Sequence, residues 1–177
     1  ELFDDELNLD SALRGEASVP ATEWSGLDHL EGKAVTIVAD GVSIGEKTVS
    51  VGKITLDEPA ITVEIGLPYT HVVEPLPPAA AGDGVMVRKI RMVEAIFRVQ
   101  ETQALCLDVG RGLKDIALRH IGENDILDAP PPAVSGDIHV RALGWQTELA
   151  DPLWRIEQNV PLPFTLLSVM TELKLSD

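Results

Sequence analysis

The sequence is poor in several features that would assign a chain to a particular class of protein. It has one cysteine among 177 residues, which excludes an internal disulfide framework. Cys106 lies in the apolar stretch 104–107, so we expect a buried free thiol, because a reactive thiol needs exposure and a lowered pKa. No apolar run is long enough to cross a bilayer, so no membrane span is expected.

Basic residues are scarce as well. The 14 Lys and Arg residues face 29 Asp and Glu residues, which gives a net charge of −15. This balance argues against a nucleic-acid-binding surface, because neutralising phosphates requires clustered Lys and Arg. Two explanations of the acidity stay open, namely solubility and a surface that must not adhere to nucleic acid. Residues 1–6 are acidic where a secretory signal would be basic, and Glu1 in place of Met leads us to expect a fragment or a processed product.

Most of the chain alternates between apolar and polar residues, and turn residues recur about every ten positions. This pattern predicts an all-β, mainly antiparallel fold that is sandwich-like or barrel-like, with short strands, long loops and little helix. The strands are expected at 35–39, 48–51, 54–56, 61–65, 69–73, 86–101, 105–109, 137–145, 153–157 and 164–175. Turns are expected at 40–41, 52–53, 57–59, 66–68 and 110–112.

The composition also predicts a division of the chain. Residues 1–20 are expected to form an acidic N-terminal segment with a helical turn at 7–13, which Gly15 and Pro20 stop. Residues 21–76 would form a small β subdomain, 77–84 a linker of Pro, Ala and Gly, and 85–177 an antiparallel β subdomain that could be continuous with the first. Another helical turn is left open within 113–128, and the three prolines in 129–133 exclude a central strand.

The stretch from Gly41 to Gly45 reads G-x-S-x-G, the pattern of a hydrolase nucleophile elbow around Ser43. An elbow requires a strand, a sharp turn and then a helix. Residues 35–39 provide the strand, but 46–51 continue with a β pattern rather than a helical one. We therefore interpret Ser43 as part of an exposed inter-strand loop with turn glycines, and a serine hydrolase is the least favoured function.

No other pattern predicts catalysis, and the chain is not expected to be an enzyme. The four histidines are too far apart for a metal site, and neither a calcium loop nor a phosphate loop is present, so no metal or cofactor is predicted. We interpret His29 as a hydrogen-bonded structural histidine. Trp24, Trp145 and Trp154 could form a sugar-binding platform, but packing in the core or across a hairpin is favoured.

Several segments together carry a resemblance to a known family. WSGLDHLEGK at 24–33 precedes VTIVADG at 35–41, and TVS at 48–50, GKITL at 52–56 and VEIGLPYT at 63–70 follow. This order resembles the tail nozzle, or tail tubular protein B, of short-tailed (podovirus-type) phages and related prophage proteins. The segment PLPFT at 161–165 fits as well, and the resemblance covers most of 22–172. The positions that carry it are Trp24, Gly26, Leu27, His29, Leu30, Gly32, Asp40, Gly41, Gly66, Leu67, Pro68, Tyr69, Pro161 and Pro163.

The resemblance implies a non-enzymatic structural protein, made in the bacterial cytoplasm and located in the virion as part of the phage tail. Such proteins form a ring, commonly of six subunits, around the channel through which DNA leaves. The implied partners are other copies of the chain, other tail proteins such as an adaptor, fibre or spike, and DNA that passes without specific binding. Family members are longer, so this chain would be a C-terminal part or a separate piece. The alternative is a carbohydrate-binding or receptor-binding β module of a phage tail.

Overall fold

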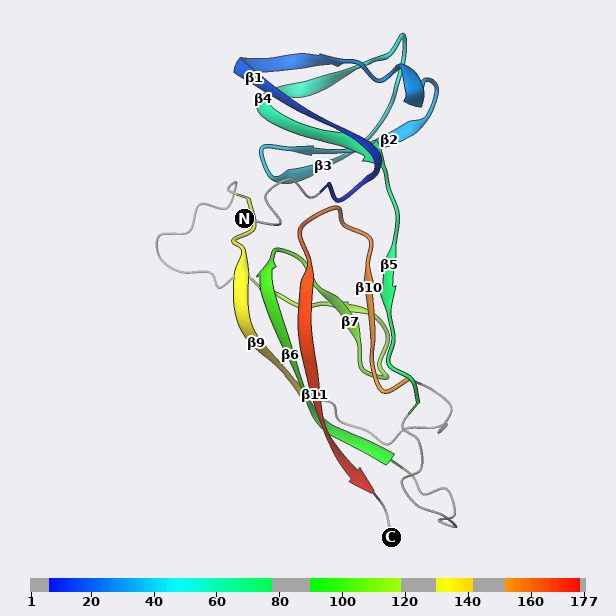
Figure 1. The fold of residues 1–177 in the computed structure, drawn as a ribbon, viewed down its shortest axis with the longest axis vertical. Helices are drawn as coiled ribbons and strands as arrows, with labels where there is room; N and C mark the ends of the chain where they lie inside the picture. Colours follow the sequence, from blue (N-terminus) through cyan, green and yellow to red (C-terminus); the bar gives the residue numbers. More distant parts are fainter. Residues whose placement is uncertain (1–6, 78–89, 119–129, 142–151, 176–177) are drawn as a thin grey trace. The chain divides into compact units, whose positions relative to one another are not determined.

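A computed structural model describes residues 7–77, 90–118, 130–141 and 152–175 of the chain (Figure 1). The regular secondary structure of these ranges is antiparallel strand, apart from one short 3-10 helix, η1 (Asp28–Leu30). The strands form three sheets, and none of the three closes into a barrel within the described ranges. The prediction of an all-β, mainly antiparallel fold with little helix is therefore confirmed.

The chain divides into two compact units. Unit 1 comprises 1–70, 121–131 and 159–162, and unit 2 comprises 71–120, 132–158 and 163–177. The break falls between Thr70 and His71, so the strand that starts at His71 belongs to unit 2. Most of the expected linker, 78–84, lies outside the described residues.

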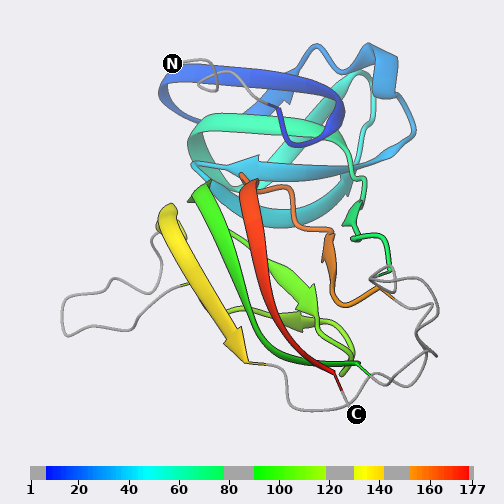
Figure 2. The same ribbon diagram turned by 60° about the horizontal axis from the view of Figure 1, so that its bottom comes forward.

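The described strands of unit 1 form one four-stranded sheet with the order β1-β4-β2-β3. They are β1 (Asp10–Ser25), β2 (Ala34–Ala39), β3 (Val42–Thr48) and β4 (Lys53–Leu67). All neighbouring strands in this sheet are antiparallel. Figure 2 shows β1 and β4 as long, strongly curved ribbons. Their pairing is interrupted by register shifts, and such irregularities let a strand pair bend around its own core.

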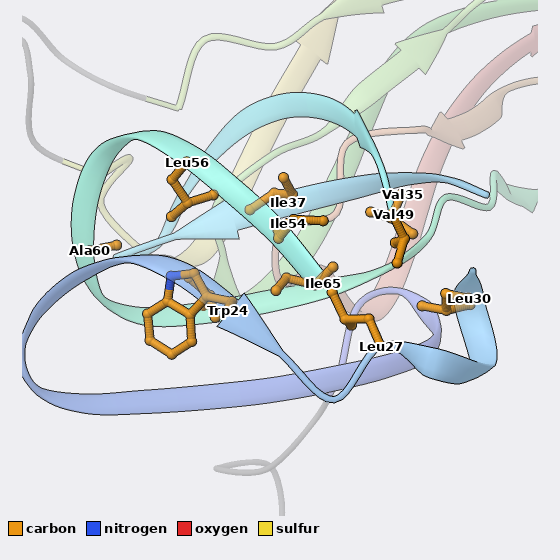
Figure 3. Packing of buried hydrophobic residues seen from close by; sticks show 11 residues of the cluster. Trp24, Leu27, Leu30, Val35, Ile37, Val49, Ile54, Leu56, Ala60 and Ile65 are labelled. Atoms are coloured by element: carbon orange, nitrogen blue, oxygen red, sulfur yellow. The ribbon is translucent and has the colours of Figure 1, made fainter. Parts of the chain in front are cut away.

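The core of unit 1 lies within this curved sheet (Figure 3). It contains apolar side chains from β1, β2 and β4, together with Leu27, Leu30 and Val49 from the segments between strands. In β4, Ile54 and Leu56 are buried while Lys53 and Thr55 are exposed, which is the alternation of a half-buried strand. The buried members are Trp24, Leu27, Leu30, Val35, Ile37, Val49, Ile54, Leu56, Ala60, Val63 and Ile65.

The prediction for the N-terminal segment is wrong, because Asp10–Ser25 form strand β1 rather than a helical turn and an acidic tail. β1 lies at the edge of the sheet, where a proline is tolerated. Pro20 lies in the register shift between Glu16 and Ala21, so it does not interrupt a paired stretch. At Gly15 a Cβ atom would lie 2.7 Å from Cζ3 of Trp24, so the glycine permits a close approach of the indole ring.

Two predicted turns also need correction. Residues 57–59 stay within β4, because β4 bends there: between the pairs Ala21–Ala60 and Glu23–Thr55, one residue of β1 lies opposite four residues of β4. The hairpin turn expected at 52–53 lies one residue earlier, at 51–52, between the bridged residues Ser50 and Lys53. The turn at 40–41 is confirmed.

Unit 2 is a sandwich of two sheets with a shared core. One sheet has the order β5-β10-β7-β8 and the other β11-β6-β9. Phe97 and Trp154 meet edge to face in the core, with ring centroids 5.4 Å apart and ring planes at 82°. The strands are β5 (His71–Val73), β6 (Ile90–Thr102), β7 (Cys106–Asp108), β8 (Lys114–Asp115), β9 (Val134–Arg141), β10 (Arg155–Gln158) and β11 (Thr165–Leu175).

The strands predicted for this half of the chain are present wherever the structure describes them. The region 86–101, which the β-branched residues favoured as a strand, contains β6. The strands expected at 105–109, 137–145, 153–157 and 164–175 correspond to β7, β9, β10 and β11. At 114–115 a short strand occurs in the region where a helical turn was left open, and 119–129 lie outside the described ranges.

Candidate functional site

The first sequence block of the resemblance, 24–33, is hydrogen-bonded in unit 1 to the blocks at 48–50 and 52–56. The backbone N–H of Leu27 donates to the carbonyl of Gly52 at 3.0 Å, and that of Gly32 donates to Val49 at 3.1 Å. In return, Val49 N–H donates to the carbonyl of Lys33 at 3.0 Å. The segment 26–33 is therefore fixed against the end of the β3–β4 hairpin.

Glu31 strengthens this junction through its side chain. Oε1 accepts a hydrogen bond from the N–H of Val51 at 2.9 Å, and Oε2 accepts one from Gly52 at 2.7 Å. Val51 and Gly52 have φ of 56° and 62°, and a β-branched residue rarely adopts this left-handed conformation. The N–H groups of Gly52 and Val51 hold the pKa of Glu31 below its usual value. The carboxylate therefore stabilises a strained turn, and sequence reasoning did not identify this role.

Asp40 makes a second junction, between the β2–β3 turn and β4. Its Oδ1 accepts hydrogen bonds from the N–H and the hydroxyl of Thr62, at 2.8 and 3.0 Å, and from the N–H of Ile61 at 3.1 Å. The Thr62 N–H is the main reason that the pKa of Asp40 is lowered. Asp40 and Gly41 both have positive φ, 47° and 79°, which suits a tight two-residue hairpin.

The other motif positions of unit 1 serve packing and chain reversal. Trp24, Leu27 and Leu30 belong to the core, and Leu67 packs against it. His29 has its Nε2 2.9 Å from the carbonyl oxygen of Ser11, which is the contact of a structural histidine.

Besides Gly41, three motif glycines lie in this unit, and they relax different constraints. Gly26 and Gly32 have positive φ, 96° and 73°. Gly66 instead permits a close approach: a Cβ there would lie 2.8 Å from the carbonyl oxygen of Asp10.

The remaining motif positions do not converge on one site. Pro68 and Tyr69 follow β4 and are exposed, and Tyr69 lines an open hollow of about 400 Å³ with Leu9 and Asp10. Pro161 is buried and belongs to unit 1. Pro163 is exposed in unit 2, where its carbonyl accepts a hydrogen bond from Gln103 N–H at 2.9 Å.

Ser43 does not occupy a nucleophile elbow. It lies inside β3, paired with Val38, and not in the inter-strand loop that we expected. The register shift between Ile37 and Val38 leaves Ile44 as an extra residue of β3, and the chain continues as a strand to Thr48. The strand–turn–helix context of a catalytic serine is therefore missing at this position.

The structure offers little for the other chemistries considered. Within 7–77, 90–118, 130–141 and 152–175, no three His, Cys, Asp or Glu side chains are grouped to hold a metal ion. Trp24 and Trp154 are 8% and 7% exposed, so neither offers a ring face to a sugar, and Trp145 lies outside the described ranges. Cys106 is half-buried, and burial followed by the nearby Asp115 raises its pKa, which favours the thiol over the reactive thiolate.

Two further results bear on the identity of the chain. In the part that the structure describes, no helix is long and apolar enough to cross a membrane. No model of a known protein family matches the sequence, and no curated protein matches it.

Proposed function

We propose that the chain is a structural component of a phage tail, part of a nozzle-type ring that takes part in tail assembly and DNA passage. The observation that carries this proposal is that the unit 1 residues that carry the resemblance have structural roles. The turn glycines reverse the chain, the apolar residues fill the core, and Asp40 holds a hairpin. Such roles suit a residue pattern that specifies a shape for assembly.

The charge of the chain supports the same proposal. A net charge of −15 repels DNA phosphate, and a channel wall with this property lets DNA slide without binding. A ring subunit also needs surfaces that neighbouring copies cover, and the open sheets of the described ranges have edge strands that suit this purpose.

The proposal is tested on purified particles of the phage or induced prophage that encodes the chain. Quantitative mass spectrometry should detect the chain at several copies per particle, together with other tail proteins. Particles from a strain that lacks the gene should have incomplete tails, and complementation with the intact gene should restore them. Absence of the chain from particles, or normal tails without the gene, would contradict the proposal.

A further inference from the structure

The sheet β11-β6-β9 of unit 2 has two edges available for another chain. β9 and β11 each pair with β6 and with no other strand in the described part of the molecule. An unpaired edge presents a row of backbone donors and acceptors to any strand that can approach it. On β11, the exposed side chains include Leu167 and Met170, at 55% and 53% exposure. An edge of this kind is usually protected or used for association.

The residues of this sheet form rows that run across the three strands. Residues 95 and 97 of β6 are fully buried in the core, so the residues that alternate with them belong to the opposite face. The cross-strand partners on that face make three rows, and each row extends from β11 through β6 to β9. The rows are Ser168–Arg98–Asp137, Met170–Ile96–His139 and Glu172–Glu94–Arg141.

The third row has opposite charges at its two ends. β11 contributes Glu172, and β9 contributes Arg141, whose side chain is 84% exposed. Glu94 lies between them, and its carboxylate is 3.7 Å from Nε of Arg141, a long and weak contact. The strong pair of this face is in another row, where Arg98 donates two hydrogen bonds to Asp137 at 2.7 and 2.8 Å. Arg141 therefore has donors available for a carboxylate outside its own sheet.

The direction of the strands makes these two ends complementary. β6 is antiparallel to both β9 and β11, so β9 and β11 run in the same direction. A second copy in the same orientation could place its β11 along β9 and continue the sheet as a parallel pair. In the register that continues the rows, Glu172 of the second copy lies beside Arg141, and Met170 of the second copy lies beside His139.

We propose that copies of this chain associate head to tail through β9 of one copy and β11 of the next, with Arg141 opposite Glu172. The contact uses two different surfaces, so each copy keeps one free edge for the next copy. Repetition of such a contact gives a ring when the rotation closes and a filament when it does not. This inference rests on the proposed function only in taking a second copy of the chain as the partner, because the complementarity itself comes from the two edges.

Charge reversal tests the contact through complementation between two variants. We expect E172R and R141E each to weaken self-association of the 177-residue chain at least about tenfold, because each places like charges opposite one another at every contact. An equimolar mixture of the two should associate again, in a 1:1 ratio, because every contact in an alternating assembly is then between opposite charges. The double variant R141E/E172R should associate by itself. Sedimentation velocity over a range of concentrations measures all four samples.

A matched control keeps a folding defect apart from a contact defect. Glu58 is exposed on β4 in unit 1, so E58R reverses a charge away from both edges and should associate like the unchanged chain. A misfolded single variant would stay misfolded in the mixture, whereas a contact defect is rescued there. The inference is overturned if the unchanged chain stays monomeric, if the single variants associate normally, or if the mixture fails to associate. A chain found in particles but without this contact would retain the proposed function and lose the inference.

Discussion

The substitution Gly66→Ala tests whether the start of β1 packs against the end of β4. A Cβ atom at position 66 would lie 2.8 Å from the carbonyl oxygen of Asp10, 2.8 Å from Cβ of Leu9 and 3.0 Å from Cα of Ala12. Two of these three contacts are with backbone atoms, which a rotamer change cannot relieve. Gly66 does not have a positive φ, so the alanine meets a steric obstacle rather than a conformational one.

Whether Gly66→Ala raises or lowers the stability shows whether the space around position 66 is free or already filled. Alanine in place of glycine stabilises a protein by about 0.4–1 kcal/mol where space is free, because it restricts the unfolded chain. Overpacking of a tightly packed position costs about 1–3 kcal/mol. Since the obstacle here is mostly backbone, we expect a net loss of about 1–2 kcal/mol, given that cost and the smaller gain. This loss corresponds to a fall in melting temperature of about 4–16 °C for a unit of this size.

Thermal unfolding followed by circular dichroism measures the loss, and hydrogen exchange locates it. In Gly66→Ala, exchange should increase in the first residues of β1, which begins at Asp10. Gly45→Ala is the control, because Gly45 has φ of 100° and no atom would lie within 4 Å of its Cβ. Its cost is conformational and should leave exchange in early β1 unchanged. Unchanged or increased stability of Gly66→Ala would refute the close packing of β1 on β4.

Two further predictions concern acid stability and the core of unit 2. In the folded chain the pKa values of Glu31 and Asp40 lie below their usual 4.5 and 3.8. The two carboxylates therefore stabilise the fold fully at a pH above these usual values, and this stabilisation is lost as the pH falls through the lowered pKa values of the folded state. The variant E31Q/D40N should therefore be less stable at neutral pH and should lose less stability on acidification, as urea unfolding at several pH values would measure; an unchanged pH dependence would contradict this. Phe97→Ala should cost about 3–5 kcal/mol, because Phe97 is fully buried against Trp154. The exposed Val19→Ala is the control, with a cost within about 0.5 kcal/mol, and equal losses in both would contradict the packing of Phe97 in the core of unit 2.

The sequence predicted most of the strands because their alternation is local. β2 is rich in β-branched residues and ends at the turn residues 40–41. The β-branched content favoured a strand at β6, and β11 is an apolar run that follows the prolines at 161 and 163. β1 was missed because Gly15 and Pro20 are usually boundary residues, and here each is tolerated for a long-range reason. Gly15 accommodates the ring of Trp24, and Pro20 lies at a register shift in an edge strand. Neither contact can be recognised from neighbours in the sequence.

The candidate site was predictable to a similar extent. The turn at Asp40 and the burial of Leu27 follow from residue type and pattern. The role of Glu31 does not, because its two hydrogen-bond donors lie 20 and 21 residues away. At Ser43 the β pattern of the following residues already argued against a nucleophile elbow, but it did not show that Ser43 itself lies inside β3 rather than in a loop.

Electron cryo-microscopy of intact particles tests the central claim most directly. Maps in which β-strands are visible should show several copies of the two-unit chain around the axis along which DNA passes, within the tail. A map of a complete tail in which no density accommodates either unit would contradict the account, as would copies located only in the head.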